Sequence, residues 1–389
     1  MTTATLSPHD LAIDHELAQL TERYRFLLDL TPVNVEEQRC AFLDGDVTEP
    51  TFHYRPLEDD PDVADAMLAA VDVGDVEDPT LGHLLRAKHR ELALQLAMLR
   101  ARDTSEFLPL SLELYGAVTP ALLARAEAIL DQTEVPARST DGRIDAVRFV
   151  RLAERELAHY RSVDADIGVH VEIRPDATGV LVSGCDLIVG RAVRVPRGRV
   201  PALIQHEVGT HLVTYVNGTY QPIRLMAAGL AGYEQTQEGL AVLAEHLVGG
   251  LTPFRLRQLA GRVVAVHGMV AGRSFGEVHG ELVAAGFSAS SAFTTAMRAF
   301  RSGGLTKDAI YLRGLVEIVE HLAGGGDLDL LWLGKVSLDD LPLIDDLHER
   351  GVLTGPKLLP RYLHDPGTQA RLRHTATLTD VADMIERTS

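Results

Sequence analysis

The spacing of apolar residues divides the 389-residue chain into helical stretches and one stretch of strands. Apolar positions recur every three or four residues over 9–31 and 81–102, and again in two segments within 117–162. This spacing places them on one face of a helix. From 251 to the end of the chain the same spacing dominates. The pattern therefore predicts a mostly helical protein.

One stretch between these helices reads VHVEIRPDATGVLVSGCDLIVGRAVRVPRG and starts at residue 169. It alternates Val and Ile with polar residues and has turn residues at PDATG and SGCD, which predicts two or three short strands of a small sheet. The following residues, RVPALIQHEVGTHLVTYVNG, return to helical spacing. Pro201 suits a first helical turn, and Asn217 with Gly218 suits a helix end. We therefore predict a single helix over 199–218.

These elements together predict an α+β fold, in which a small sheet lies beside the 199–218 helix and further helices surround both. The chain is longer than a single core usually organises. We divide it into an N-terminal helical lobe, 1–105, and a larger domain, 106–389.

Composition is that of an ordinary soluble protein, with 46% hydrophobic and 24% charged residues. The formal net charge of −18 argues against a protein that binds nucleic acid. Cys40 and Cys185 lie far apart, which fits free thiols in a reducing compartment. We see neither a signal peptide nor a run approaching about 18 apolar residues. We therefore expect a cytoplasmic protein without a membrane span.

The 199–218 helix contains the motif HEVGTH, which is one residue longer than the HExxH of zinc peptidases. On a regular helix, positions five apart point about 140° away from each other, so His206 and His211 would not face one metal ion. A single π-type turn, with its hydrogen bond from i to i+5, would stack them, and Gly209 would ease the distortion. The plain alternative is a chance match between two structural histidines.

A catalytic zinc site needs a third protein ligand. The downstream stretch GYEQTQEGLAVLAEHL has helical spacing and carboxylates at Glu234, Glu238 and Glu245. Glu238 lies 27 positions after His211, and the following Gly239 would let another helix backbone approach. Glu234 is the rival ligand, and a solvent-facing glutamate is the plain alternative. If Glu238 binds the metal, Glu234 or Glu245 would be available to orient a ligand histidine.

The pair HEVGTH and QEGLA resembles the QEGLA-motif protein family, which is related to the microtubule-associated tyrosine carboxypeptidases, a group of zinc metallopeptidases. Further similarity lies in TPVNVEEQRCAFL, PTFHYRP, AFRSGGLTKDAIYLRG and GPKLLPRYL, so it covers most of the chain. The resemblance implies that His206, His211 and Glu238 bind zinc and that Glu207 is the catalytic base. It also implies that 106–389 is a metallopeptidase catalytic domain. One departure is Gln237, where some animal members have a second glutamate.

Residues 251–316 carry eight Lys or Arg against three acids, although the whole chain is acidic. Arginine and lysine suit the terminal carboxylate that a carboxypeptidase must bind. Arg298, Arg301 and Lys307 are therefore candidate substrate-binding residues. Tyr311 lies four residues after Lys307, on the same face of a predicted helix, and is a candidate donor to the oxyanion. Surface cations around a core tyrosine are the plain alternative.

The leading hypothesis is a zinc metallocarboxypeptidase that removes a C-terminal residue, possibly tyrosine or another aromatic residue, from a peptide or protein. Glu207 would act as general base towards a zinc-activated water, and a neighbouring strand would hold the extended peptide. A zinc endopeptidase or amidase is one alternative. A non-enzymatic regulator of gene expression is another, although a structural zinc site has no use for Glu207. We expect Zn²⁺ as cofactor and no nucleic-acid or membrane partner, and the oligomeric state stays open.

Overall fold

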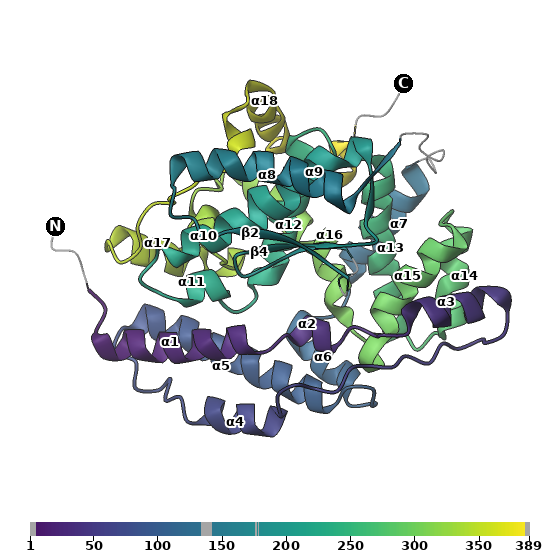
Figure 1. Cartoon of the computed structure of the whole chain (residues 1–389), viewed down its shortest axis with the longest axis horizontal. Coiled ribbons are helices and arrows are strands. Elements are labelled where there is room, and N and C mark those ends of the chain that lie inside the picture. The colour runs from purple at the N-terminus through teal and green to yellow at the C-terminus, as the bar shows by residue number, and fades with distance from the viewer. Residues whose placement is uncertain (1–4, 134–141, 176, 178, 386–389) are drawn as a thin grey trace.

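The computed structural model describes residues 5–133, 142–175, 177 and 179–385. The chain is mostly helical with two small sheets, which confirms the predicted α+β fold (Figure 1). Within the described residues no single helix combines the length and apolar composition needed to cross a membrane. The bent pair Phe107–Tyr115 and Pro120–Gln132 reaches that length and composition only when the two helices are taken together.

The first six helices of the chain run along one side of the molecule, and the seventh lies apart from them (Figure 1). Their bounds are α1 Pro8–Arg23, α2 Phe26–Asp29, α3 Val35–Asp44, α4 Pro61–Ala69, α5 Pro79–Arg100, α6 Phe107–Tyr115 and α7 Pro120–Gln132. Several begin with proline in the first turn after a capping side chain, as in α5, where Asp78 accepts a hydrogen bond from the Leu81 amide at 3.0 Å. The predicted helix over 9–31 is wrong in detail, because the chain is extended at Tyr24 and α2 is a separate turn.

Along the chain, two sheets follow α7 and precede the motif helix, which contains HEVGTH. Helix α8 packs against strands of both sheets. The bounds are β1 Arg143–Asp145, α8 Ala146–Val163, β2 His170–Arg174, β3 Val180–Ser183, β4 Asp186–Gly190 and β5 Arg194–Pro196. In the larger sheet the order is β2-β4-β3, with β2 parallel and β3 antiparallel to β4. The smaller sheet pairs β1 with β5. The predicted strands are confirmed, and the SGCD turn is the β3–β4 hairpin, where Gly184 has a φ of 58°.

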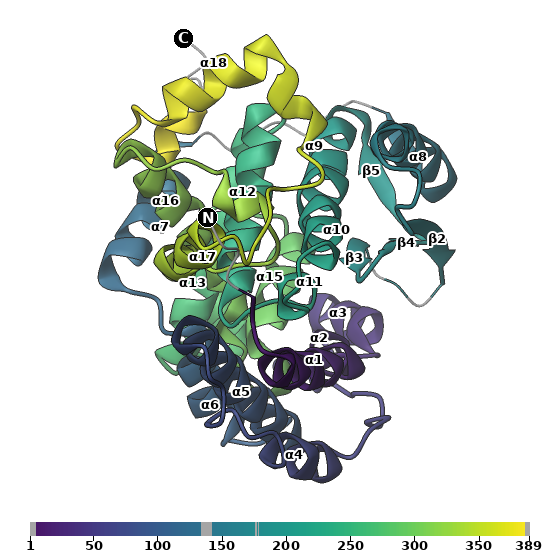
Figure 2. The same ribbon diagram turned by 90° about the vertical axis from the view of Figure 1, so that its left-hand side faces the viewer.

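The remaining helices form the other side of the molecule. Their bounds are α9 Val200–His206, a π-helical turn Glu207–Leu212, α10 Val213–Thr219, α11 Leu225–Ala228, α12 Tyr233–Leu247, α13 Pro253–Val270, α14 Phe275–Ala284, α15 Ala289–Phe300, α16 Ile310–Ala323, α17 Leu341–Glu349 and α18 Pro366–Thr375. Short 3₁₀ turns lie at Arg197–Arg199, Arg301–Gly303, Thr306–Ala309, Leu330–Trp332, Leu338–Asp340, Arg361–His364 and Val381–Met384. The α9–α10 segment lies between α12 on one side and β3 on the other (Figure 2).

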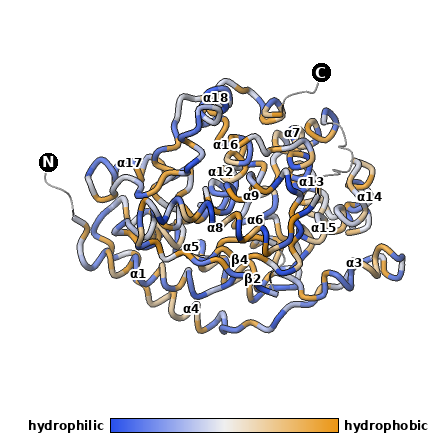
Figure 3. Tube along the Cα trace, turned by 45° about the horizontal axis from the view of Figure 1, so that its top comes forward, coloured by the Kyte–Doolittle hydropathy of each residue, from blue (hydrophilic) through white to orange (hydrophobic). Residues whose placement is uncertain are grey.

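One hydrophobic core runs through the described chain, from Ile13 in α1 to Met384 near the end. Both hydrophobic and hydrophilic residues occur within the outer helix α1, as expected for a helix that buries one face (Figure 3). Asp14 of α1 also accepts hydrogen bonds from the Arg224 and Leu225 amides at 2.5 and 3.1 Å, which ties this helix to the start of α11. The boundary at residue 105 stays a prediction.

The motif helix ends later than the sequence indicates, at Thr219 rather than at Asn217 and Gly218. Asn217 is fully buried, and its side chain bonds Trp332 O and Leu358 O at 2.7 and 2.9 Å. A Cβ on Gly218 would lie 2.3 Å from Met226 O. Asn217 is therefore polar because it bonds buried carbonyl groups, and Gly218 is small because another backbone segment passes close to it. Neither residue terminates the helix.

Candidate active site

The extra residue in HEVGTH is accommodated by a π-helical turn over Glu207–Leu212, as predicted. The Thr210 hydroxyl donates to the Gln205 carbonyl, five residues earlier, at 3.0 Å. As a result the rings of His206 and His211 lie on one side of the helix, with centroids 5.1 Å apart and planes at 79°. The local distortion thus brings together two histidines that a regular helix would separate.

Gly209 does not serve the role that the sequence suggested for it. Among the described residues it is not one of the glycines with positive φ, so the π turn does not depend on its conformational freedom. A Cβ there would lie 2.3 Å from Gln205 Oε1 and 3.2 Å from Tyr362 Cε1. Glycine leaves room here, because the side chain of Gln205 and the ring of Tyr362 lie close over the turn.

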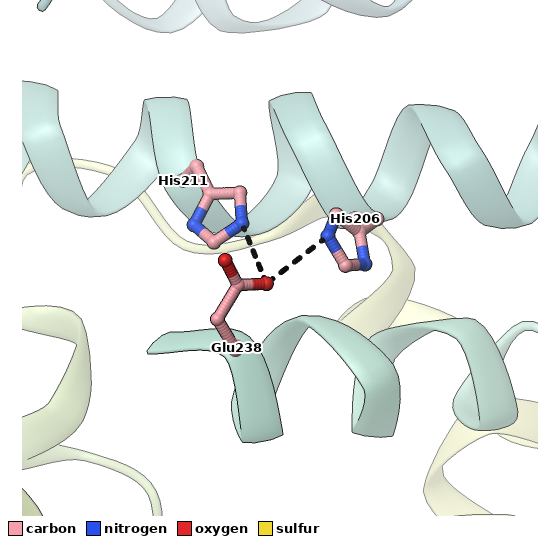
Figure 4. A group of neighbouring side chains, drawn as sticks. All are labelled: His206, His211 and Glu238. Carbon is pink, nitrogen blue, oxygen red and sulfur yellow. Dashed lines mark ion pairs between the residues drawn. The ribbon is translucent and has the colours of Figure 1, made fainter. Parts of the chain in front are cut away.

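His206, His211 and Glu238 converge across the gap between the motif helix and α12 (Figure 4). Each offers one donor atom, and the three donor atoms lie within 4.8 Å of one another. Glu238 Oε2 is 3.6 Å from His206 Nε2 and 3.8 Å from His211 Nε2. These distances are too long for hydrogen bonds, and Oε2 is buried without a hydrogen-bond partner. Two imidazoles and a carboxylate with an unsatisfied oxygen fit a zinc ion that needs three protein ligands.

Glu245 orients the first of these histidines. Its Oε1 accepts a hydrogen bond from His206 Nδ1 at 2.9 Å, so that Nε2 is the ring nitrogen that faces Glu238. Arg199 Nη1 and Arg255 Nη2 lie 2.8 and 3.2 Å from the same carboxylate, which is 1% exposed. The structure therefore selects Glu245 over Glu234 as the carboxylate that orients a ligand histidine.

Glu238 is placed by an unusually close crossing of α12 and α16. A Cβ on Gly239 would lie 2.2 Å from the carbonyl carbon of Gly314, and a Cβ on Gly314 would lie 2.0 Å from Gln235 O. The two backbones therefore touch at these glycines, as the sequence led us to expect for Gly239. The crossing fixes the position of Glu238 relative to the start of α16.

Burial shifts the pKa of two residues of the site, His211 and Glu207, in opposite directions. It lowers the pKa of His211 to about 4, so this imidazole is neutral and can offer a lone pair at neutral pH. It raises the pKa of Glu207 to about 7, and the nearby carboxylates of Glu238 and Glu245 act in the same direction, while His206 opposes them. A pKa near 7 suits a group that must accept and return a proton.

Two of the three basic residues predicted to bind substrate, Arg298 and Lys307, already pair with a carboxylate of the protein. Arg298 binds Asp308 through Nε and, at 2.8 Å, through Nη2. Lys307 Nζ lies 3.3 Å from Oε1 of Glu234, the rival ligand candidate. Burial lowers the pKa of Lys307, but the charge of Glu234 outweighs it and raises this pKa to about 12. Arg301 is 6% exposed. Their roles in substrate binding stay predictions.

Tyr311 lies beside this basic group and within electrostatic reach of the cluster. Its ring centroid is 4.5 Å from Arg262 Cζ and 5.8 Å from Lys307 Nζ. Burial raises the pKa of the Tyr311 hydroxyl, and the charge of Glu238 adds to this effect. The hydroxyl therefore stays protonated and available as a hydrogen-bond donor.

Three basic residues near the site were not singled out from the sequence: Arg199, Arg255 and Lys335. Glu245 lies seven residues after Glu238 and hence on the same face of α12. A buried carboxylate at that position needs basic partners, and this was the one signal that could have pointed to the two arginines. Lys335 comes from a loop almost a hundred residues beyond Glu238, and no motif marks it. Its contacts are described below.

Comparisons with known proteins relate the chain to a family of carboxypeptidases. A family model described as microtubule-associated tyrosine carboxypeptidase matches residues 41–379. The chain is 29% identical over 177 residues to human microtubule-associated tyrosine carboxypeptidase 1, an alignment covering 42% of this chain and 36% of the relative. It is 23% identical over 356 residues to mouse putative tyrosine carboxypeptidase MATCAP2, covering 87% of this chain and 59% of that protein. The chain thus spans between about a third and three fifths of these relatives.

Proposed function

The chain belongs to the microtubule-associated tyrosine carboxypeptidase family, and from this premise we propose that it is a zinc-dependent carboxypeptidase acting on the C-terminus of a peptide or protein. The observation that carries the proposal is the convergence of His206, His211 and Glu238 on one point, with Glu207 buried next to the first histidine. The relatives are named for tyrosine, and we extend this preference to an aromatic terminal residue here.

In this proposal the chain's own groups move protons and stabilise charge. Bound zinc would supply a Lewis acid that polarises the scissile carbonyl and acidifies water. Glu207 takes a proton from the attacking water and returns it to the leaving amine. The Tyr311 hydroxyl donates to the oxyanion that develops on the carbonyl oxygen.

Strand β3 is suited to hold the peptide. It is an edge strand that bonds β4 on one side, and it packs against the π-helical turn. Among the described residues no strand pairs with its other edge. An extended peptide can add to such an edge through backbone hydrogen bonds.

The test combines metal analysis with peptide sequencing from the C-terminal end. We expect about one zinc per purified chain, and loss of zinc in His211→Ala and Glu238→Ala but not in His279→Ala, a histidine of α14 outside the cluster. Glu207→Gln should keep zinc and lose release of terminal amino acids from a mixed peptide library. Internal cleavage would favour the endopeptidase alternative, and no zinc after chelator-free purification would refute the proposal.

A further inference from the structure

Most basic side chains around the candidate site are neutralised by a neighbouring carboxylate. The pairs are Lys88 with Glu91, Arg255 with Glu245, Arg298 with Asp308 and Lys307 with Glu234. Lys335 differs: no carboxylate of the described chain lies within 4.0 Å of its ammonium group. A half-buried cation without a counter-ion is costly unless another group compensates its charge.

Two tyrosine rings supply part of that compensation. Lys335 Nζ lies 5.2 Å from the ring centroid of Tyr215 and 5.6 Å from that of Tyr233. Tyr215 follows His211 by four residues, so it lies one turn further along the same helix face. Tyr233 is the first residue of α12, the helix that carries Glu238. The lysine is therefore held by the same two helices that provide the predicted metal ligands.

The backbone of Lys335 is fixed as firmly as its side chain. Its amide donates to Met226 O at 2.7 Å, and its carbonyl accepts from the Leu230 amide at 3.0 Å. A Cβ on the preceding Gly334 would lie 2.5 Å from Met226 O, so the chain passes closely between these groups. Rigid anchoring means that the ammonium group does not have to be ordered when a ligand binds.

The charge of Lys335 also reaches the site electrostatically. Its ammonium group is close enough to His211 for the two to interact through space. Burial lowers the pKa of Lys335 itself to about 8, and the charge of Lys88 adds to this, so it is still mainly charged at neutral pH. An anion bound here would lie near Tyr215 and Tyr233, on the two helices that carry the predicted metal ligands.

We propose that Lys335, held by the rings of Tyr215 and Tyr233, binds a carboxylate of the peptide substrate. The proposal rests on the proposed peptidase function and specifies which substrates it accepts. The carboxylate is either the terminal one of the peptide or that of an Asp or Glu side chain upstream of the cleaved bond. It places the carboxylate on a different residue from Arg298 and Lys307, which already pair with Asp308 and Glu234, and from Arg301, which is 6% exposed.

The experiment compares Lys335→Met with the full-length wild-type chain. Lys357→Met is the matched control, because Lys357 also lies over a tyrosine ring, 5.3 Å from the centroid of Tyr220, but pairs with Asp164 at 3.5 Å. Three peptides ending in tyrosine are used: a free acid with upstream glutamates, the same peptide as C-terminal amide, and the free acid with glutamines. Kd is measured by calorimetry in the Glu207→Gln background, and KM and kcat in the active background.

We expect Lys335→Met to weaken binding of the first peptide by about 10- to 100-fold and to raise KM similarly, with a smaller effect on kcat. Lys335→Arg should recover part of this loss, and Lys357→Met should show none. If the loss vanishes for the amide, the terminal carboxylate is the ligand. If it vanishes for the glutamine peptide, the acidic side chain is the ligand.

Equal affinities of wild type and Lys335→Met for all three peptides, with unchanged zinc content and melting temperature, would overturn the proposal. An equal loss of affinity for all three peptides would do the same, because the loss would then not depend on either carboxylate. Carboxylate-selective binding without any hydrolysis would instead refute the peptidase function while retaining the role of Lys335. The two failures are therefore distinguishable.

Discussion

The contact between Gly239 and Gly314 predicts that Gly239→Ala is harmful, although alanine is the better helix former. The new methyl group would lie 2.2 Å from the carbonyl carbon of Gly314. An ordinary contact begins at 3.4 Å, so α12 and α16 must separate by about 1.2 Å to admit it. A backbone carbonyl cannot rotate away as a flexible side chain can.

The expected magnitude follows from two opposing effects. Replacing a helical glycine by alanine stabilises a helix by about 1 kcal/mol. Overpacking a close contact costs typically about 1–3 kcal/mol, and a rigid backbone contact belongs at the upper end of that range. We expect the free energy of unfolding to fall by about 2 kcal/mol. Because Glu238 adjoins Gly239, we also expect kcat/KM to fall by up to about 100-fold, since misplacement by 1 Å can have that effect.

Urea unfolding followed by circular dichroism measures the free energy of unfolding. Peptide hydrolysis measures kcat/KM, and a zinc titration shows whether the site still binds metal. Gly280→Ala is the matched control, because Gly280 lies in α14 with nothing within 4 Å of its added Cβ. It should gain up to about 1 kcal/mol and leave zinc binding unchanged. If Gly239→Ala were as stable and as active as Gly280→Ala, the close helix crossing would not be what positions Glu238.

Three further predictions follow from buried polar contacts. Glu245→Gln should weaken zinc binding by about 10- to 100-fold, measured by competition with a chromophoric chelator, because His206 loses its charged partner; unchanged affinity would contradict this. Asn217→Ala should lower the free energy of unfolding in urea by about 3 kcal/mol, because it leaves backbone groups of Trp332 and Leu358 without a partner. A loss below about 1 kcal/mol would be too small for this explanation. Burial raises the pKa of Asp14 to about 6, so the folded chain binds a proton that the unfolded chain, with a pKa near 4, has released. Stability should therefore fall by about 3 kcal/mol as pH rises from about 4 to 6 relative to Asp14→Asn, and parallel pH profiles would refute this.

Features that depend on residues close together in the chain were predictable. The π-helical turn follows from the spacing of His206 and His211, because a shared metal requires them to face one side. The β3–β4 hairpin follows from alternating Val and Ile around a glycine turn. The sequence offered two glutamates one turn apart, Glu234 and Glu238, as the third ligand. The resemblance to a known family favoured Glu238, and the geometry agrees with that choice.

Features that depend on contacts between distant segments were missed or misread. In the sequence, Gly209, Asn217 and Gly218 look like signals for a helix distortion or a helix end. In the structure their roles come from tertiary contacts. Gly209 lies against Tyr362, Asn217 bonds Leu358 O, and Gly218 lies against Met226. Arg298 and Lys307 read as free cations, since a sequence shows charges without showing which carboxylate each one meets.

The sequence by itself determined the fold class, the motif helix with its inserted residue and a short set of candidate ligands, because each depends on periodicity or on residues within a few turns. Only the tertiary structure decided which glutamate orients His206, which cations are neutralised and where Lys335 lies. Those outcomes depend on helices crossing at particular backbone distances, as α12 and α16 do at Gly239 and Gly314, and pairwise contacts of this kind are not encoded in any local pattern.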